Sequence, residues 1–173
     1  MSDSNRHAES SEPQLRLEMS SQARFLVAAR AMIASTAQRL GFSEAHCGQI
    51  SLALDEALCN IINHGYGKKP DGRIWINIHE LPGDTPGMKI VIEDRAKQVD
   101  PAHIRSRDLD DIRPGGLGVY IIREVMDDVK YEKRPDGGMR LTLVKTAGNS
   151  EPDHSNEKAN ASASGREVKH EQR

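Results

Sequence analysis

The feature that most constrains this chain is a helix-like segment, residues 43–66, whose polar and apolar side chains fall on two separate lines. At about 100° per residue, Glu56, Asn60 and Asn63 share one line of the helix surface. The opposite line is apolar and carries Ile50, Leu54, Ala57, Leu58 and Ile61. A core can bury the apolar line. The polar line alone is typical of a solvated face, but in a cavity its amide oxygens can bind a hard cation and its carboxylate can accept a proton.

The ends of the chain differ in composition from its middle. The chain has 173 residues, which is enough for one ordinary domain. Residues 1–12 are polar, and residues 146–173 contain Val168 as their one large aliphatic residue. Such segments bury too little apolar surface to offset the entropy lost on ordering, so both ends are predicted to be disordered. The folded domain is therefore predicted to span residues 13–145.

Charge and hydropathy exclude several classes of function. The formal net charge is −2, which lacks the basic footprint of nucleic-acid binding, so no direct nucleic-acid partner is expected. The apolar runs are shorter than the ~20 residues that cross a bilayer, and the N-terminus has no apolar signal core. Cys47 and Cys59 lack the spacing of a metal site or redox motif, so they are predicted to be reduced. We expect a cytoplasmic protein that makes no membrane contact.

Hydrophobic periodicity and turn residues predict the order of the elements. The predicted elements are a strand at 14–19, helices at 20–40 and 43–66, strands at 73–80 and 88–93, a mobile loop at 96–114, a helix at 117–126, and strands at 129–133 and 139–145. This order predicts an α+β fold, a two-layer α/β sandwich in which a mixed, mostly antiparallel sheet carries helices on one face.

Local signals place the ends of the first two helices. Ser20 or Ser21 is predicted to cap the first helix, Gly41 to end it, and Ser43 to cap the second. In the first helix, Phe25 and its apolar neighbours such as Met32 are expected in the core, with a homodimer face as the alternative.

Two further segments carry residues suited to a nucleotide. Residues 90–94, Ile-Val-Ile-Glu-Asp, predict a strand that ends in Asp94. This carboxylate can accept a hydrogen bond from an exocyclic amine such as that of adenine, although a turn Asp is the commoner interpretation. Residues 114–118, Pro-Gly-Gly-Leu-Gly, open a helix, where backbone N–H groups and the positive helix end suit phosphates. The segment has no Walker lysine, which excludes a P-loop.

Taken in order, these motifs resemble one family. Glu56-x-x-x-Asn60, Asp94-Arg95-Ala96, Gly115-Gly116-Leu117-Gly118 and Met126-Asp127-Asp128-Val129 together resemble the anti-sigma-factor serine kinases of bacterial partner-switching systems. Those kinases are GHKL, or Bergerat-fold, ATPases. The resemblance covers about residues 14–145, and its combined spacing is more specific than any single motif.

The resemblance implies ATP and Mg²⁺ as cofactors and a role for each matching residue. Glu56 would be the general base that activates an acceptor serine, Asn60 the Mg²⁺ ligand and Asp94 the residue that recognises adenine. Residues 96–114 would form a lid over the nucleotide. The nucleotide-binding residues so implied are Asn60, Asn63, Asp94, Ala96, Gly115, Gly116, Leu117 and Gly118.

The resemblance also implies partners. It predicts an anti-sigma factor that sequesters a sigma factor and phosphorylates a serine of an anti-anti-sigma antagonist of the STAS type. The alternative is a non-catalytic interaction module that keeps the fold after its nucleotide chemistry has decayed.

Two departures from the family pattern favour the alternative. Ala96 stands where the family has glycine, and Met139 where it has threonine. If the glycine position needs a positive φ, alanine costs about 1–2 kcal/mol, and a lost hydroxyl bond costs about 0.5–1.5 kcal/mol. Glu56, Asn60, Asp94 and residues 115–118 favour the enzyme. We therefore predict that ATP binds weakly.

Overall fold

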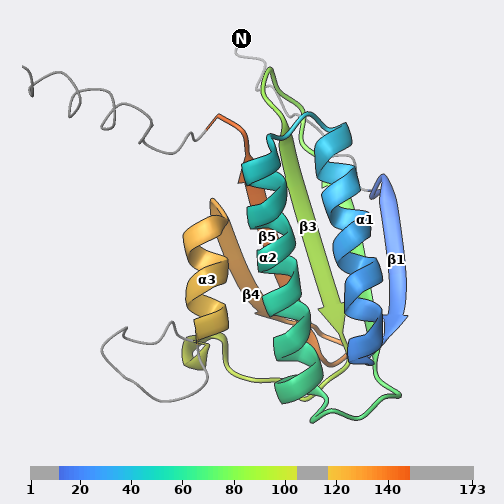
Figure 1. Cartoon of the computed structure of the whole chain (residues 1–173). Helices are drawn as coiled ribbons and strands as arrows, with labels where there is room; N and C mark the ends of the chain where they lie inside the picture. The colour runs from blue at the N-terminus through green and yellow to red at the C-terminus, as the bar shows by residue number, and fades with distance from the viewer. Residues whose placement is uncertain (1–11, 105–116, 149–173) are drawn as a thin grey trace, which may run out of the picture.

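The computed structural model describes residues 12–104 and 117–148, which form a sheet with a layer of helices on one face (Figure 1). The strands are β1 (Leu15–Ser20), β2 (Arg73–Glu80), β3 (Gly87–Asp94), β4 (Asp128–Lys133) and β5 (Met139–Thr146). The helices are α1 (Leu26–Arg39), α2 (Glu44–Asn60) and α3 (Leu117–Val125), with short turns η1 (Ala23–Phe25), η2 (Ile61–Gly65) and η3 (Pro101–His103). The predicted order of elements is confirmed.

Some predictions fall on residues outside this description. These are the disorder expected for residues 1–11 and 149–173 and the loop residues 105–116. At the C-terminal boundary, β5 continues to Thr146, one residue past the predicted end of the domain. The Ala147 N–H then donates to the Pro86 carbonyl at 2.8 Å.

The sheet has the strand order β1-β2-β3-β5-β4. All four described pairings are antiparallel, where a mixed, mostly antiparallel sheet was expected. The register aligns apolar side chains in rows that cross the sheet, because side chains of paired residues lie on the same face. One row consists of Leu17, Ile76, Ile92, Leu141 and Tyr131, and the next of Leu15, Ile78, Ile90, Leu143 and Val129. These rows form the sheet half of the core.

The helices supply the other half of the core. In Figure 1, α2 lies between α1 and α3 in front of the sheet. Four of the five residues on the predicted apolar line of α2 are buried, and Ile61 is partly buried. In α1, Met32 packs against the core as expected, but Phe25 does not, since it is 38% exposed. Within the described residues, none of the helices is long and apolar enough to cross a membrane.

Two of the predicted helix signals are confirmed. The Ser43 hydroxyl accepts a hydrogen bond from the His46 N–H at 3.2 Å and caps α2. Gly41 follows α1 with a φ of +91°, a conformation that glycine adopts without steric cost. Beyond Asn60, α2 continues into the wider π turn of η2, where the Tyr66 N–H bonds to the Ile61 carbonyl at 2.8 Å.

The predicted cap of the first helix is wrong. The chain enters α1 through η1, and neither helical segment has a side-chain cap. Ser21 is 2% exposed, and its hydroxyl donates to the Lys69 carbonyl at 2.5 Å and accepts from the Gly72 N–H at 2.9 Å. The hydroxyl therefore joins the end of β1 to the loop before β2, since a buried polar group needs a partner.

Replacing Ser21 with alanine should lower the free energy of unfolding by about 1–3 kcal/mol, because it leaves a carbonyl and an N–H of the loop unpaired. Urea unfolding followed by circular dichroism measures the change. Ser35→Ala, at an exposed position of α1, is the matched control and should change stability by no more than about 0.5 kcal/mol. Equal losses in the two variants would contradict this role for Ser21.

Candidate functional site

A cavity of about 360 Å³ lies where α2, η2, α3 and the ends of β3, β4 and β5 meet. Its volume is in the range of small-molecule pockets. Much of its wall is apolar and includes Ile61, Val99, Ile104, Val119 and Leu141. Three of the predicted site residues, Asn60, Asp94 and Ala96, line this cavity together. The cavity therefore joins segments that are far apart in the sequence.

Asp94 is the most constrained polar residue of the cavity. The residue is 3% exposed, and its Oδ1 accepts hydrogen bonds from the N–H of Ala96 at 2.8 Å and of Met139 at 3.2 Å. Among the described residues, both bonds to this carboxylate reach Oδ1, which leaves Oδ2 as an acceptor for a ligand. The bond to Ala96 also makes Asp94 a turn residue, as the commoner interpretation predicted.

The environment of Asp94 changes its ionisation. Burial raises the pKa of the Asp94 carboxyl, while the two backbone N–H bonds and the guanidinium of Arg134 act in the opposite direction. The net result is a pKa above the ordinary value. A buried carboxylate of this kind is stabilised further by any ligand that donates a hydrogen bond to it.

The carboxylate of Glu56 and the amide of Asn60 lie against the first turn of α3. A Cβ atom on Gly118 would be 2.6 Å from Glu56 Oε2 and 3.2 Å from Asn60 Nδ2. Glycine at this position therefore lets α3 approach α2 at the point where both polar side chains project. Glu56 itself does not line the cavity, but it lies one helical turn before Asn60, which does.

The other predicted residues do not reach the cavity or lie outside the described part. Asn63 is exposed and does not line the cavity, whereas His64 does. The reason is the π turn, whose extra residue per turn rotates the side chains after Asn60 away from a line drawn at 100° per residue. Leu117, the first residue of α3, is 53% exposed, and residues 115–116 lie outside the described residues.

The condition on which backbone strain at Ala96 depended, a positive φ, is not met. Within the described residues, Lys68 is the one non-glycine residue with a positive φ, so Ala96 has an ordinary backbone. A Cβ added to Gly65 would lie 2.9 Å from the Ala96 Cβ, which shows that Gly65 provides the space for this methyl group. Met139 lines the cavity, and its N–H supports Asp94 whatever its side chain is.

Sequence reasoning missed several residues of the cavity. Tyr131 and Met139 lie near the ends of β4 and β5, and only the strand order brings them beside Asp94. Lys97 and His103 lie in the segment predicted as a lid. Their position in that segment was the one sequence signal that could have identified them as residues lining the cavity. Burial of the Tyr131 phenol raises its pKa to about 12, with a smaller opposite effect from Arg123.

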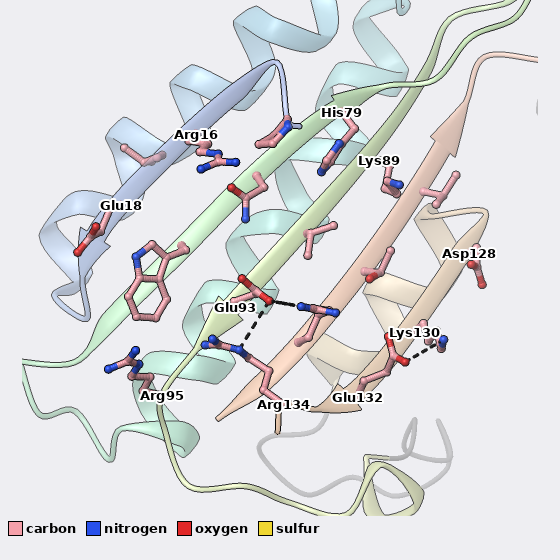
Figure 2. Close-up of a pocket in the computed structure, with 18 residues that line it drawn as sticks. Arg16, Glu18, His79, Lys89, Glu93, Arg95, Asp128, Lys130, Glu132 and Arg134 are labelled. Carbon is pink, nitrogen blue, oxygen red and sulfur yellow. Dashed lines mark hydrogen bonds and ion pairs between the residues drawn. The ribbon is translucent and has the colours of Figure 1, made fainter. Parts of the chain in front are cut away.

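A larger hollow of about 970 Å³ lies over the opposite face of the sheet, which none of the described helices covers (Figure 2). Some of its charged side chains pair with each other: Glu93 contacts Arg140 at 2.7 Å and Arg134 at 3.6 Å. Arg134 also donates to the Asp94 carbonyl at 2.9 Å, so this face supports the cavity from behind. We assign the site to the smaller cavity, because among the described residues it is the one lined both by the buried carboxylate of Asp94, from β3, and by the partly buried amide of Asn60, from α2.

Comparison with known proteins agrees with this geometry. Residues 19–145 match the model of the histidine kinase-like ATPase domain, and the chain belongs to this family. Among its relatives is the serine-protein kinase RsbW of Listeria innocua serovar 6a, which is 27% identical over 135 residues, covering 75% of this chain and 84% of the relative. The serine-protein kinase RsbW of Oceanobacillus iheyensis is 30% identical over 116 residues, covering 61% and 70% respectively.

Solved structures include the Erythrobacter litoralis EL346 blue-light activated histidine kinase, with a TM-score of 0.47 and 15% identity. The comparison covers 70% of this chain and 42% of that kinase. The resemblance to serine kinases of the GHKL type, made from the sequence motifs, is thus confirmed by the family and by the names of the relatives.

The ionisation of Asp94 should make stability depend on pH in a definable direction. Its folded-state pKa is raised, so below the ordinary value of 3.8 the carboxyl is neutral in both states and burial carries no charge penalty. As pH rises through the folded pKa, the folded state must hold a buried charge and loses stability relative to an uncharged variant.

We therefore expect Asp94→Asn to gain stability relative to wild type as the pH rises above 3.8, since its amide oxygen can still accept both N–H bonds. Urea unfolding at several pH values measures this difference. Asp84→Asn, in an exposed loop, serves as the reference for the loss of one carboxylate. A difference that shrinks with rising pH would contradict the assigned burial effect.

Proposed function

We propose that this chain is an ATP-dependent protein serine kinase and anti-sigma factor, active in the cytoplasm. The observation that carries the proposal is Asp94, a buried carboxylate with one oxygen held by two backbone N–H groups, in the same cavity as Asn60. An adenine amino group is a suitable donor for the remaining oxygen. The relatives are named serine-protein kinases, which supports a serine hydroxyl as the group that accepts the phosphate.

Glu56 is the proposed general base. A serine hydroxyl is a poor nucleophile at neutral pH and needs a base within reach. Glu56 would take the hydroxyl proton while the serine oxygen forms a bond to the terminal phosphorus of ATP and the bond to ADP breaks. The close approach of Gly118 to Glu56 supports this role, since it brings the backbone of α3 beside the carboxylate.

Asn60 is the proposed Mg²⁺ ligand. Its amide oxygen is a hard donor, and Mg²⁺ in kinases usually has few protein ligands and takes the others from phosphates and water. The residues present therefore fit this ion. Bound there, Mg²⁺ would neutralise charge on the phosphates. Residues 115–118, Ala96 and Asn63 complete the set of proposed nucleotide-binding residues, although the exposure of Asn63 limits it to the rim.

The proposed partners are a sigma factor, which the chain would sequester, and a STAS-type anti-anti-sigma antagonist, which would accept the phosphate. A homodimer through α1 is part of the proposal. It is supported by exposed apolar side chains on and before that helix, Phe25 at 38% and Val27 at 65%. The competing function, a non-catalytic interaction module, would keep these surfaces and lose ATP binding.

Nucleotide binding can be tested by thermal stability. Mg-ATP at 100 times its dissociation constant should stabilise wild type by about 2.7 kcal/mol, which raises the melting temperature visibly. Asp94→Asn should abolish the shift, because an amide presents a donor to the adenine amino group. Asp84→Asn should keep it. The absence of a shift and of calorimetric heat for wild type with millimolar Mg-ATP would favour the interaction module.

Phosphate transfer tests the role of Glu56. With γ-labelled ATP and a purified STAS-type antagonist, Glu56→Gln should lower the transfer rate by about 10²- to 10⁴-fold, because the base is removed. Its dissociation constant for ATP should stay within about three-fold of wild type, since the change is isosteric. Glu124→Gln, at an exposed position of α3, is the matched control. Unchanged transfer by Glu56→Gln would refute the assignment.

A further inference from the structure

The residues after α2 contact the segment that follows β3. The π turn is held by the N–H groups of Tyr66 and Lys68, which bond to the carbonyls of Ile61 and Ile62, each at 2.8 Å. Because this turn holds one residue more than an α-helical turn, it brings Gly65 against Ala96. It also places the Tyr66 ring against Gly72, where an added Cβ would lie 2.5 Å from the ring.

The hydroxyl of Tyr66 links two strands at the point where their pairing ends. Tyr66 Oη donates to the Arg73 carbonyl at 2.6 Å and accepts from the Arg95 N–H at 2.8 Å. Burial raises the pKa of this phenol, so the proton stays on Oη and is available for donation.

The β2–β3 ladder has its last pair at this end between Ile74 and Asp94. The same register would place Arg73 opposite Arg95. The hydroxyl therefore bridges the two backbone groups of the next pair and replaces a direct bond between the strands. It lets the chain leave the sheet immediately after Asp94 without leaving an N–H and a carbonyl unpaired.

Other contacts hold Asp94 itself but leave the Arg95 N–H to Tyr66. Oδ1 is held by Ala96 and Met139, and the Asp94 carbonyl by Arg134. The Arg95 side chain lies on the opposite face, with its guanidinium 5.5 Å from the centroid of the Trp75 ring (Figure 2). Tyr66 thus acts on the backbone of the segment from the helix side of the sheet.

We propose that Tyr66 is a positioning residue for the nucleotide site, whose hydroxyl sets the place where the Asp94–Ala96 segment leaves the sheet and so aims the Asp94 carboxylate into the cavity. The inference rests on the proposed function, because it deepens the role given to Asp94. Tyr66 is not among the residues that line the cavity, so it would act through Asp94 and Ala96.

Tyr66→Phe is the direct test, since it keeps the ring on Gly72 and removes both hydrogen bonds. We expect the dissociation constant for ATP to rise about three- to ten-fold, the size of one lost hydrogen bond. In the transfer assay, KM for ATP should rise by the same factor with kcat unchanged, since Glu56 is untouched. Ser51→Ala, which removes the bond from the Ser51 hydroxyl to the Cys47 carbonyl, is the control and should change neither constant.

A second readout needs no nucleotide. Amide hydrogen exchange followed by NMR should show the Arg95 N–H exchanging faster in Tyr66→Phe than in wild type or Ser51→Ala. Unchanged exchange at Arg95, or unchanged ATP affinity with faster exchange, would overturn the proposal. If wild type binds no ATP, the proposed function fails, but the exchange experiment still tests the structural role of Tyr66. Faster exchange of the Arg95 N–H in Tyr66→Phe would support that role, and unchanged exchange would refute it.

The contact between Gly65 and Ala96 provides an independent variant pair. Gly65→Ala should weaken ATP binding by about ten-fold, because its methyl group would displace Ala96 from the end of β3. Adding Ala96→Gly should restore most of the affinity by removing the facing methyl. Failure of the double variant to recover would overturn the claim that the π turn positions this segment.

Discussion

The site depends on the pair of hydrogen bonds that the backbone donates to Asp94 Oδ1. The Ala96 N–H comes from the segment after β3, and the Met139 N–H from the start of β5. One carboxylate oxygen therefore joins a strand end, the segment that leaves it, and a neighbouring strand. Burial alone would favour the neutral acid, and these bonds offset part of that effect. The consequence is a carboxylate held in place with its second oxygen available.

Helix α2 combines two requirements in one element. Its apolar line is buried in the same core as the isoleucine rows of the sheet. On another side, Glu56 and Asn60 meet the first turn of α3, which comes close because residue 118 has no side chain. The same helix then widens into the π turn, and this local change of pitch delivers Gly65 and Tyr66 to the segment beyond Asp94. Core packing and site geometry thus share one scaffold.

The sequence predicted the elements well because their signals are local. Alternating isoleucines predicted β2 and β3, and Ser43 and Gly41 marked helix ends through their own backbone preferences. Asp94 was found because it ends an apolar strand. The errors have a common physical origin in contacts between distant segments. Ser21 has the composition of a helix cap, but its hydroxyl bonds to a loop 48 residues away.

The apolar periodicity by itself determined an α+β sandwich and the face of α2 that is buried. These properties follow from the spacing of side chains along one helix or strand. Only the tertiary structure decided that Asn63 points to solvent, that Gly65 makes room for Ala96, and that the Tyr66 hydroxyl completes the strand pairing beside Asp94. These features depend on the π turn and on packing between distant segments. A pattern that assumes a fixed angle per residue can predict neither the change of helical pitch nor the contacts between segments.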